Sequence, residues 1–284
     1  MYTKSTISII VLVLLVQQPS FSKTKLTLQK SFDQQCIKAK AICTGGLELN
    51  YIITNLLKDS LVLVLPPGWR FNSNDPKNDY QDILVTKQQI LVLKAKETKT
   101  FHVKGYCCEY TKSGPVNGIA YTNGKLADST LVNLARYLAA QKIDENAQQH
   151  SVWAISDRQE TANITSQQDS LAQVLRNYVA TLKGEPLPWY TLFKKSGVSR
   201  TGSITNQPIR FKTDIVYSVT KDCYSYCFIV DEKGNVVSEI FGKWLYSNEN
   251  DYHASFDTRN LKPGSYKLVL KNSLEPLFER EFKI

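Results

Sequence analysis

The chain has 284 residues, 21% of them charged, and a formal net charge of +9. Its Lys and Arg residues are scattered among acidic residues instead of forming one basic block, which argues against a nucleic-acid-binding surface. The sequence contains no phosphate-binding loop, dinucleotide-binding fingerprint or paired-carboxylate motif, so we expect no cofactor. A chain of this length predicts two or three domains.

The first 22 residues have the pattern of a signal peptide. Lys4 precedes an apolar run over residues 7–16, and Ser20-Phe21-Ser22 ends the segment. The run is too short to span a bilayer, and small residues stand where signal peptidase cuts. We expect cleavage near Ser22 and a mature chain without a transmembrane segment. That chain would be secreted, periplasmic or on the outer cell surface.

A first β-sandwich is predicted over residues 23–112. Short apolar or alternating segments, residues 47–53 and 61–65 among them, are separated by turn residues. Several short strands at this spacing are typical of an antiparallel sandwich. Residues 49–71, with the turn at Pro66-Pro67-Gly68, resemble immunoglobulin-like sandwiches of exported bacterial proteins. The resemblance implies a fold rather than a function.

A helical domain is predicted over residues 113–190. Apolar residues at helical spacing follow Ser129, which can cap a first helix. A second helix is predicted over residues 144–155, and a third from Thr165 or Ser166. These three helices would separate the first sandwich from the rest of the chain.

After a predicted linker over residues 191–205, strand patterns resume and predict a second sandwich over residues 206–284. The turn-rich motifs in residues 231–237 and 261–266 resemble C-terminal sandwiches of the flagellar-hook-cap type and of type IX secretion in Bacteroidetes. The resemblance implies a sorting or adhesive module. The predicted fold class is thus β-rich and multi-domain: an immunoglobulin-like β-sandwich, a three-helix segment and a C-terminal β-sandwich.

Six cysteines follow the predicted cleavage site: Cys36, Cys43, Cys107, Cys108, Cys223 and Cys227. In an oxidising compartment an even number of cysteines suggests disulfides, although their pairing cannot be read from the sequence. The simplest local pairs are Cys36 with Cys43 and Cys223 with Cys227. Cys107 and Cys108 are then left over.

Residues 105–157 hold the best candidates for chemistry. Tyr106-Cys107 followed by Gln149-x-x-Val152-Trp153 resembles the thioester domains of bacterial surface adhesins. In those proteins a Cys thiol and a Gln carboxamide condense, with loss of ammonia, into a thioester that acylates an amine on the target. The resemblance implies that Cys107 and Gln149 form such a bond. Strand alternation further predicts that Cys107 points with apolar residues and Cys108 with polar ones.

Other interpretations of this segment remain open. Cys107 and Cys108 could form disulfides, with Val152 and Trp153 as core residues. A hydrolase could use Cys108 as nucleophile, His150 as base and Asp157 as orienting acid. The histidines are scattered and Cys223-x-x-x-Cys227 has no histidine at zinc-site spacing, so we expect no metal.

We therefore expect an exported protein that is not an enzyme, acting as a binding or adhesion protein of the bacterial cell surface. Its partner would be an extracellular protein or a glycan surface, because four tryptophans and fifteen tyrosines can supply stacking faces as well as core. The alternatives are a thioester adhesin using Cys107 and Gln149 and a cysteine hydrolase using Cys108 and His150.

Overall fold

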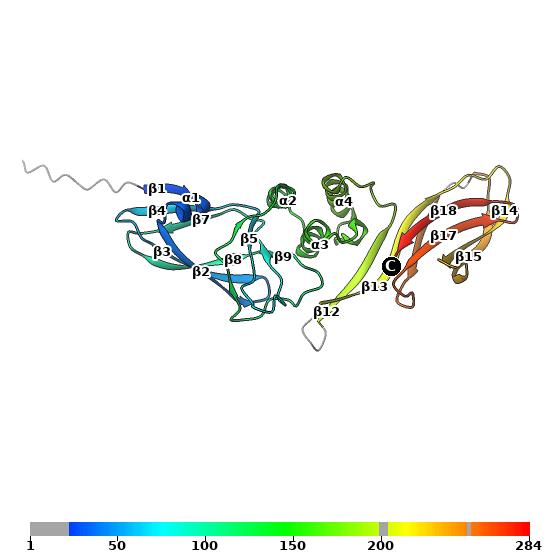
Figure 1. Ribbon diagram of the computed structural model, residues 1–284. Helices are drawn as coiled ribbons and strands as arrows, with labels where there is room; N and C mark the ends of the chain where they lie inside the picture. The colour runs from blue at the N-terminus through cyan, green and yellow to red at the C-terminus, as the bar shows by residue number, and fades with distance from the viewer. Residues whose placement is uncertain (1–22, 199–203, 249–250) are drawn as a thin grey trace, which may run out of the picture.

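The computed structural model describes residues 23–198, 204–248 and 251–284, and the predicted signal peptide lies outside these residues. Figure 1 shows strands at both ends of the molecule and, apart from a short helix among the N-terminal strands, helices between them. The described residues form five β-sheets and four α-helices. The chain is therefore β-rich and built from more than one unit, as the sequence predicts. None of the described helices combines the length and apolar character that crossing a membrane requires.

The N-terminal unit contains three sheets. Their strand orders are β1-β4-β7, β10-β2-β3-β8 and β11-β5-β6-β9. The strands are β1 Lys23–Thr27, β2 Ile37–Gly45, β3 Glu48–Asn55, β4 Ser60–Leu65, β5 Trp69–Phe71, β6 Ile83–Leu84, β7 Gln89–Leu93, β8 Thr98–Lys104, β9 Tyr106–Cys107, β10 Ala120–Tyr121 and β11 Lys125–Leu126. Neighbouring strands are antiparallel except β1 and β4, which are parallel.

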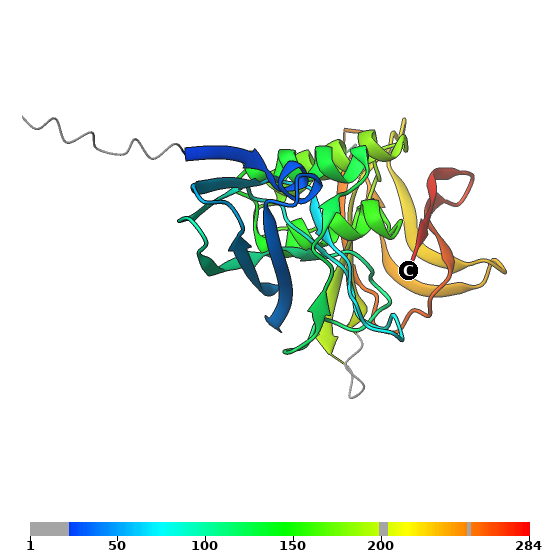
Figure 2. The same ribbon diagram turned by 60° about the vertical axis from the view of Figure 1, so that its left-hand side comes forward.

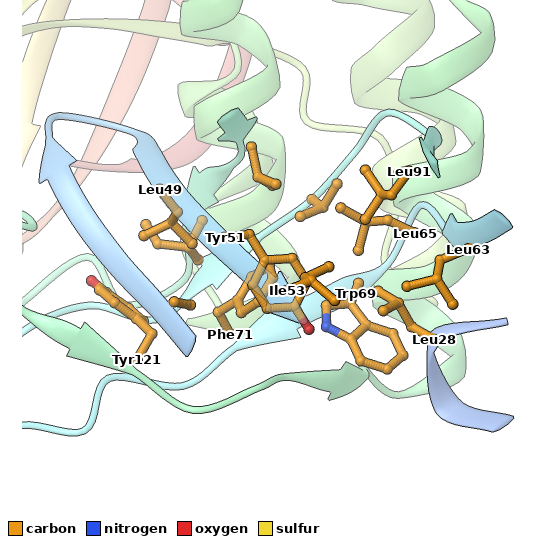
Figure 3. Packing of buried hydrophobic residues seen from close by; sticks show 14 of the residues in the cluster. Leu28, Leu49, Tyr51, Ile53, Leu63, Leu65, Trp69, Phe71, Leu91 and Tyr121 are labelled. Atoms are coloured by element: carbon orange, nitrogen blue, oxygen red, sulfur yellow. The ribbon is translucent and has the colours of Figure 1, made fainter. Parts of the chain in front are cut away.

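Alternation along the strands builds the N-terminal core. In β3 and β4 every second residue is buried, because successive side chains of a strand point to opposite faces. Figure 3 shows Tyr51 of β3 beside Phe71 of β5, in the same cluster as Trp69. The rings of Tyr51 and Phe71 meet edge to face with centroids 5.0 Å apart. This contact joins two different sheets.

Gly105 lets the chain pass from one sheet to another. The strand alternation used to orient Cys107 assumes one continuous strand before the cysteines, but β8 pairs with β3 while β9 pairs with β6. A Cβ atom on Gly105 would lie 2.5 Å from Ile83 and 2.6 Å from the carbonyl oxygen of Leu84. Only glycine fits so close to the neighbouring backbone.

Four helices are present in the described residues: α1 Leu28–Asp33, α2 Ser129–Ala140, α3 Glu145–Ser156 and α4 Asp169–Lys183. The last three confirm the predicted helices, and a short 3-10 helix, η1 Thr161–Asn163, lies between α3 and α4. The N-cap of α2 is Asp128 and not Ser129, because the Asp128 carboxylate accepts from two backbone N–H groups of the first turn. Helix α1 was not predicted.

The C-terminal unit is made of two sheets with one core between them. Their orders are β12-β13-β16 and β15-β14-β17-β18. The strands are β12 Thr191–Val198, β13 Ile204–Val216, β14 Cys223–Asp231, β15 Val236–Leu245, β16 Asp251–Asp257, β17 Ser265–Asn272 and β18 Pro276–Lys283. Phe211 and Ile215 from β13 share the core with Ile229 from β14 and Leu268 from β17.

Two predicted boundaries are wrong. The predicted linker over residues 191–205 contains β12, which pairs with β13 along its length. The predicted helical domain over residues 113–190 begins with β10 and β11, which extend sheets of the N-terminal unit. In both cases pairing with a neighbouring strand outweighs a local sequence rich in turn or charged residues.

Candidate functional site

Cys107 and Cys108 point into two different hydrophobic cores. Cys107 belongs to the N-terminal core, whereas Cys108 packs among residues of the helices, including Leu134 and Val152. The prediction that Cys108 lies on a polar face is wrong, because helices α2 and α3 cover that face. The two adjacent thiols therefore have separate surroundings.

Burial keeps both thiols protonated. It raises the pKa of Cys107 to about 12, and raises the pKa of Cys108 well above its ordinary value despite the nearby Arg70 cation. Because the thiolate is the nucleophile, neither side chain is activated in this arrangement.

Gln149 lies against the backbone of Cys107, which brings the two thioester candidates together. The Cys107 N–H donates to Gln149 Oε1 at 3.0 Å, and Gln149 Nε2 donates to the Cys107 carbonyl at 2.8 Å. Strand β9 is the outer strand of its sheet, so these groups of Cys107 have no strand partner on that side. The carboxamide takes the place of a partner strand, and both of its polar atoms are used in doing so.

Two more side chains at the end of α3, Ser156 and the C-cap residue Asp157, continue this contact. Ser156 Oγ donates to the Cys108 carbonyl at 2.6 Å, and the Tyr110 N–H donates to Asp157 Oδ2 at 2.8 Å. Gln149 and Ser156 are seven positions apart (156 minus 149), which places them on one helix face. The polar residues of this segment therefore attach α3 to the outer edge of β9 and to the residues that follow it.

An ion cluster lies beside Cys108 that the sequence does not reveal. Arg70 Nη2 is 2.7 Å from Asp82 Oδ2 and 2.5 Å from Glu109 Oε1. The Asp82 N–H also donates to Glu109 Oε2 at 2.7 Å. Burial is the main cause that raises the pKa of Glu109. No sequence spacing connects these residues, because three separate segments bring them together.

The two remaining candidates on α3, His150 and Trp153, are buried. Trp153 Nε1 donates to Gln81 Oε1 at 3.2 Å, and its ring meets Tyr110 edge to face at 5.2 Å. His150 packs edge to face on the same indole at 5.4 Å. Burial, with a smaller effect of the Lys194 cation, lowers the pKa of His150 to about 4. Trp153 thus joins the helix to the N-terminal core.

The residues considered for a hydrolase do not form a proton relay. Asp157 uses Oδ2 to accept from the Tyr110 backbone, and Cys108 is fully buried. His102 lies on β8 and His253 on β16, far along the chain from His150. Within the described residues no group of three or more His, Cys, Asp or Glu side chains is arranged to hold a metal ion.

All six cysteines lie in the described residues and are free thiols there. The two simplest local disulfides are excluded by strand geometry. Cys36 precedes β2 and Cys43 lies near its end, so seven extended residues separate them by about 23 Å. Cys223 and Cys227 are both in β14, about 13 Å apart by the same rule. A disulfide requires Cα atoms within about 7 Å.

The C-terminal unit carries a group of exposed aromatic side chains that sequence reasoning did not single out. We call Tyr224, Tyr226 and Trp244 the aromatic surface. Tyr224 pairs directly with Trp244 across β14 and β15, with ring centroids 5.9 Å apart, and its ring lies 5.2 Å from that of Tyr226. Tyr226 is 46% exposed and Trp244 is 55% exposed. Large aromatic side chains of this exposure, in contact with each other, make this surface a candidate binding site.

Gly242 leaves room for this surface. It pairs with Tyr226 across the strands, and a Cβ atom there would lie 3.0 Å from Tyr224 Oη and 3.2 Å from the Tyr226 ring. The sequence did hold a signal: in Cys223-Tyr224-Ser225-Tyr226-Cys227 the tyrosines alternate with small side chains. Since one face of β14 is buried, the tyrosines had to lie on the outer face.

A hollow continues from the aromatic surface along the same face of the sheet. It has a volume of about 600 Å³, and Phe228, Lys271 and Glu279 line it. Lys271 pairs with Tyr226 across β14 and β17, and its Nζ lies 5.3 Å from the centroid of the Phe228 ring. The outer face therefore combines aromatic rings with a neighbouring groove that both charged and apolar side chains line.

Comparisons with known proteins add no family. No family model matches the chain, and no curated protein matches it. Among solved structures, the β-glucosidase DesR from Streptomyces venezuelae, in complex with D-glucose, is 8% identical with a TM-score of 0.17. The alignment covers 87% of this chain and 46% of that one, so this chain spans about half the length of the glucosidase. A likeness at this TM-score supports no conclusion about fold or activity.

Proposed function

We propose that this is an exported binding protein of the bacterial cell surface, without enzymatic activity, that holds a polysaccharide on its C-terminal unit. The aromatic surface is the observation that supports the proposal. Aromatic rings bury a large area, and Tyr and Trp add a polar tip, so their faces suit the C–H faces of sugar rings. We further propose that both sandwiches are immunoglobulin-like, a proposal supported in the C-terminal unit by two facing antiparallel sheets around one core.

The hollow beside the aromatic surface favours a polysaccharide chain, rather than a single sugar, as the ligand. A polysaccharide chain lying on Tyr226 can continue over Lys271 into the groove lined by Phe228 and Glu279. Charged and hydroxyl groups there can bond to sugar hydroxyls, while the rings supply contact area.

The experiment is a binding assay on insoluble polysaccharides (cellulose, chitin and starch) with the chain lacking residues 1–22. We expect retention on at least one of them, and a loss of affinity of about tenfold for Trp244→Ala, because truncating a central aromatic residue removes roughly 1–3 kcal/mol. Leu274→Ala is the control, since Leu274 is 91% exposed and lies in the turn between β17 and β18.

Retention on none of the polysaccharides would reject glycan binding. Self-association in analytical ultracentrifugation that Trp244→Ala abolishes would replace the proposal with a protein contact at the same surface.

The thioester adhesin is a second candidate, because the two residues that the resemblance implies, Cys107 and Gln149, are in direct contact. Bond formation would require the Gln149 amide to leave the Cys107 backbone and the buried thiol to lose its proton. The intact mass of the purified protein tests this candidate. A mass short by one ammonia, with the two peptides cross-linked, would establish the thioester, and an unaltered mass would eliminate it.

A further inference from the structure

A second cavity lies on the other side of the C-terminal unit, between α4 and the sheet β12-β13-β16. Figure 1 shows α4 next to β12 and β13, and Figure 2 shows the helices and these strands from another side. The cavity has a volume of about 770 Å³, which is within the range of small-molecule sites. It is separate from the aromatic surface, which lies on the outer face of the opposite sheet.

Arg176 of α4 lines this cavity as a buried cation without an ion-pair partner. The residue is 5% exposed. Its Nη1 donates to the Ile164 carbonyl at 2.8 Å and its Nη2 donates to Gln173 Oε1 at 2.7 Å. In the described part of the chain no carboxylate lies within 4.0 Å of the guanidinium.

A buried charge that lacks a counterion is unfavourable, since it has lost water without gaining a partner. Asp169, at the start of the same helix, acts on Arg176 only at longer range. The remaining N–H groups of the guanidinium form a planar fork that matches a carboxylate. An anion in the cavity would therefore supply the counterion that Arg176 lacks.

The opposite wall of the cavity carries a second cation and aromatic rings. Lys212 of β13 lines the cavity, with its Nζ 5.2 Å from the centroid of the Phe193 ring. Trp189 also lines the cavity. Of the two acids in the wall, Asp214 is hydrogen-bonded to His253 Nδ1 at 2.5 Å, and Asp169 lies near Arg176. The wall thus offers positive charge together with flat apolar area.

We propose that this cavity binds a small organic carboxylate with a ring-shaped body, of the uronic acid type. Its carboxylate pairs with Arg176 and Lys212, and its ring lies against the aromatic side chains of the wall. The inference does not rest on the proposed function, because the two sites share no residue.

The experiment is isothermal titration calorimetry of the chain lacking residues 1–22, with glucuronate as the probe and glucose as its neutral counterpart. We expect glucuronate to bind at least about tenfold more tightly than glucose, because hydrogen bonds to a charged group are the stronger ones. Arg176→Met should reduce glucuronate affinity by about tenfold or more. Lys212→Gln, at a half-buried position, should reduce it several-fold.

Lys142→Gln is the matched control, because it removes an exposed cation of the loop between α2 and α3 and should bind like the original chain. If Arg176→Met fails to fold, Lys212→Gln alone decides. Equal affinity for glucose and glucuronate, no binding of glucuronate, or unchanged affinity in Lys212→Gln would each overturn the proposal. Trp244→Ala should bind glucuronate normally, so failure of this site is distinguishable from failure of the aromatic surface.

Discussion

At the scale of single residues, the polar side chains of α3 show that a sequence motif can identify residues that meet without identifying what they do there. The resemblance to thioester domains implies that Cys107 and Gln149 lie together, and the Gln149 amide does contact the Cys107 backbone. The sequence cannot tell whether the amide faces the thiol or the backbone, because that depends on β9 being an outer strand whose N–H and C=O groups need partners. Ser156 and Asp157 likewise bond to backbone groups, those of Cys108 and Tyr110.

His150 predicts how stability changes with pH. The folded protein holds its pKa at about 4, chiefly by burial and next by the Lys194 cation, with Asp144 opposing. In the unfolded chain a histidine titrates near about 6.5. The contribution of His150 to stability is therefore fully present above about pH 6.5. As the pH drops, this contribution falls because only the unfolded chain takes up the proton. Below about pH 4 the folded chain takes up the proton too, and His150 causes no further loss.

The free energy of unfolding should fall by about 3 kcal/mol between about pH 6.5 and pH 4, and the substitution His150→Gln should abolish this pH dependence. The measurement is urea unfolding at a series of pH values, compared with Gln149→Ala. That control should lower the free energy of unfolding by roughly 1–3 kcal/mol at every pH, because it leaves the Cys107 backbone groups unpaired. Its dependence of stability on pH should match that of the original chain. Parallel curves for His150→Gln and the original chain would show that His150 is protonated or exposed in the folded protein.

At the scale of elements, the sequence predicts the helices better than the strand pairing. Helices α2, α3 and α4 follow from apolar spacing within one segment, although the capping residue of α2 differs from the predicted Ser129. Strand β12 was missed because its middle, Lys194-Lys195-Ser196-Gly197, has no apolar alternation, and its strand character comes from pairing with β13. The change of sheet at Gly105 was missed for the same reason: it depends on contacts with Ile83 and Leu84, distant in the chain.

Strand β15 offers a test in which binding weakens while stability does not fall. Gly242→Val places a branched side chain where Tyr224 and Tyr226 now lie, so their rings must move and polysaccharide affinity should fall by about tenfold, as for Trp244→Ala. The free energy of unfolding should stay equal or rise, because valine favours strands more than glycine does.

Val237→Thr is the control, since Val237 lies on the same strand, is exposed and does not line the hollow beside the aromatic surface. It should keep both affinity and stability. Retention of the Gly242→Val protein on the polysaccharide at full strength would show that the tyrosine rings do not carry the binding.

At the scale of the whole molecule, the sequence predicts the order of sandwich, helices and sandwich but not how the parts are joined. The helices contribute to both units: Trp153 is part of the N-terminal core, and Ala162 of η1 is part of the C-terminal core. Lys194 of β12 lies 5.7 Å from the centroid of the Tyr110 ring, so the C-terminal unit also contacts the segment after Cys108. Such contacts between distant segments leave no local pattern.

The true start of the C-terminal unit can be tested with two fragments. Residues 206–284 match the predicted domain but lack β12 and the aromatic residues before it. Tyr190 stacks on Phe211 at 5.1 Å, Trp189 meets Phe211 edge to face at 5.6 Å, and Leu192 is 2% exposed. Burying each such side chain contributes roughly 1.5–3 kcal/mol, so losing all three removes an amount comparable with the total stability of a small domain.

In amide proton NMR spectra, residues 187–284 should therefore give the dispersed signals of a folded domain and melt cooperatively, while residues 206–284 should give the narrow dispersion of an unfolded chain. Equal melting of the two fragments would mean that β12 adds nothing to the core and would restore the boundary that the sequence predicts.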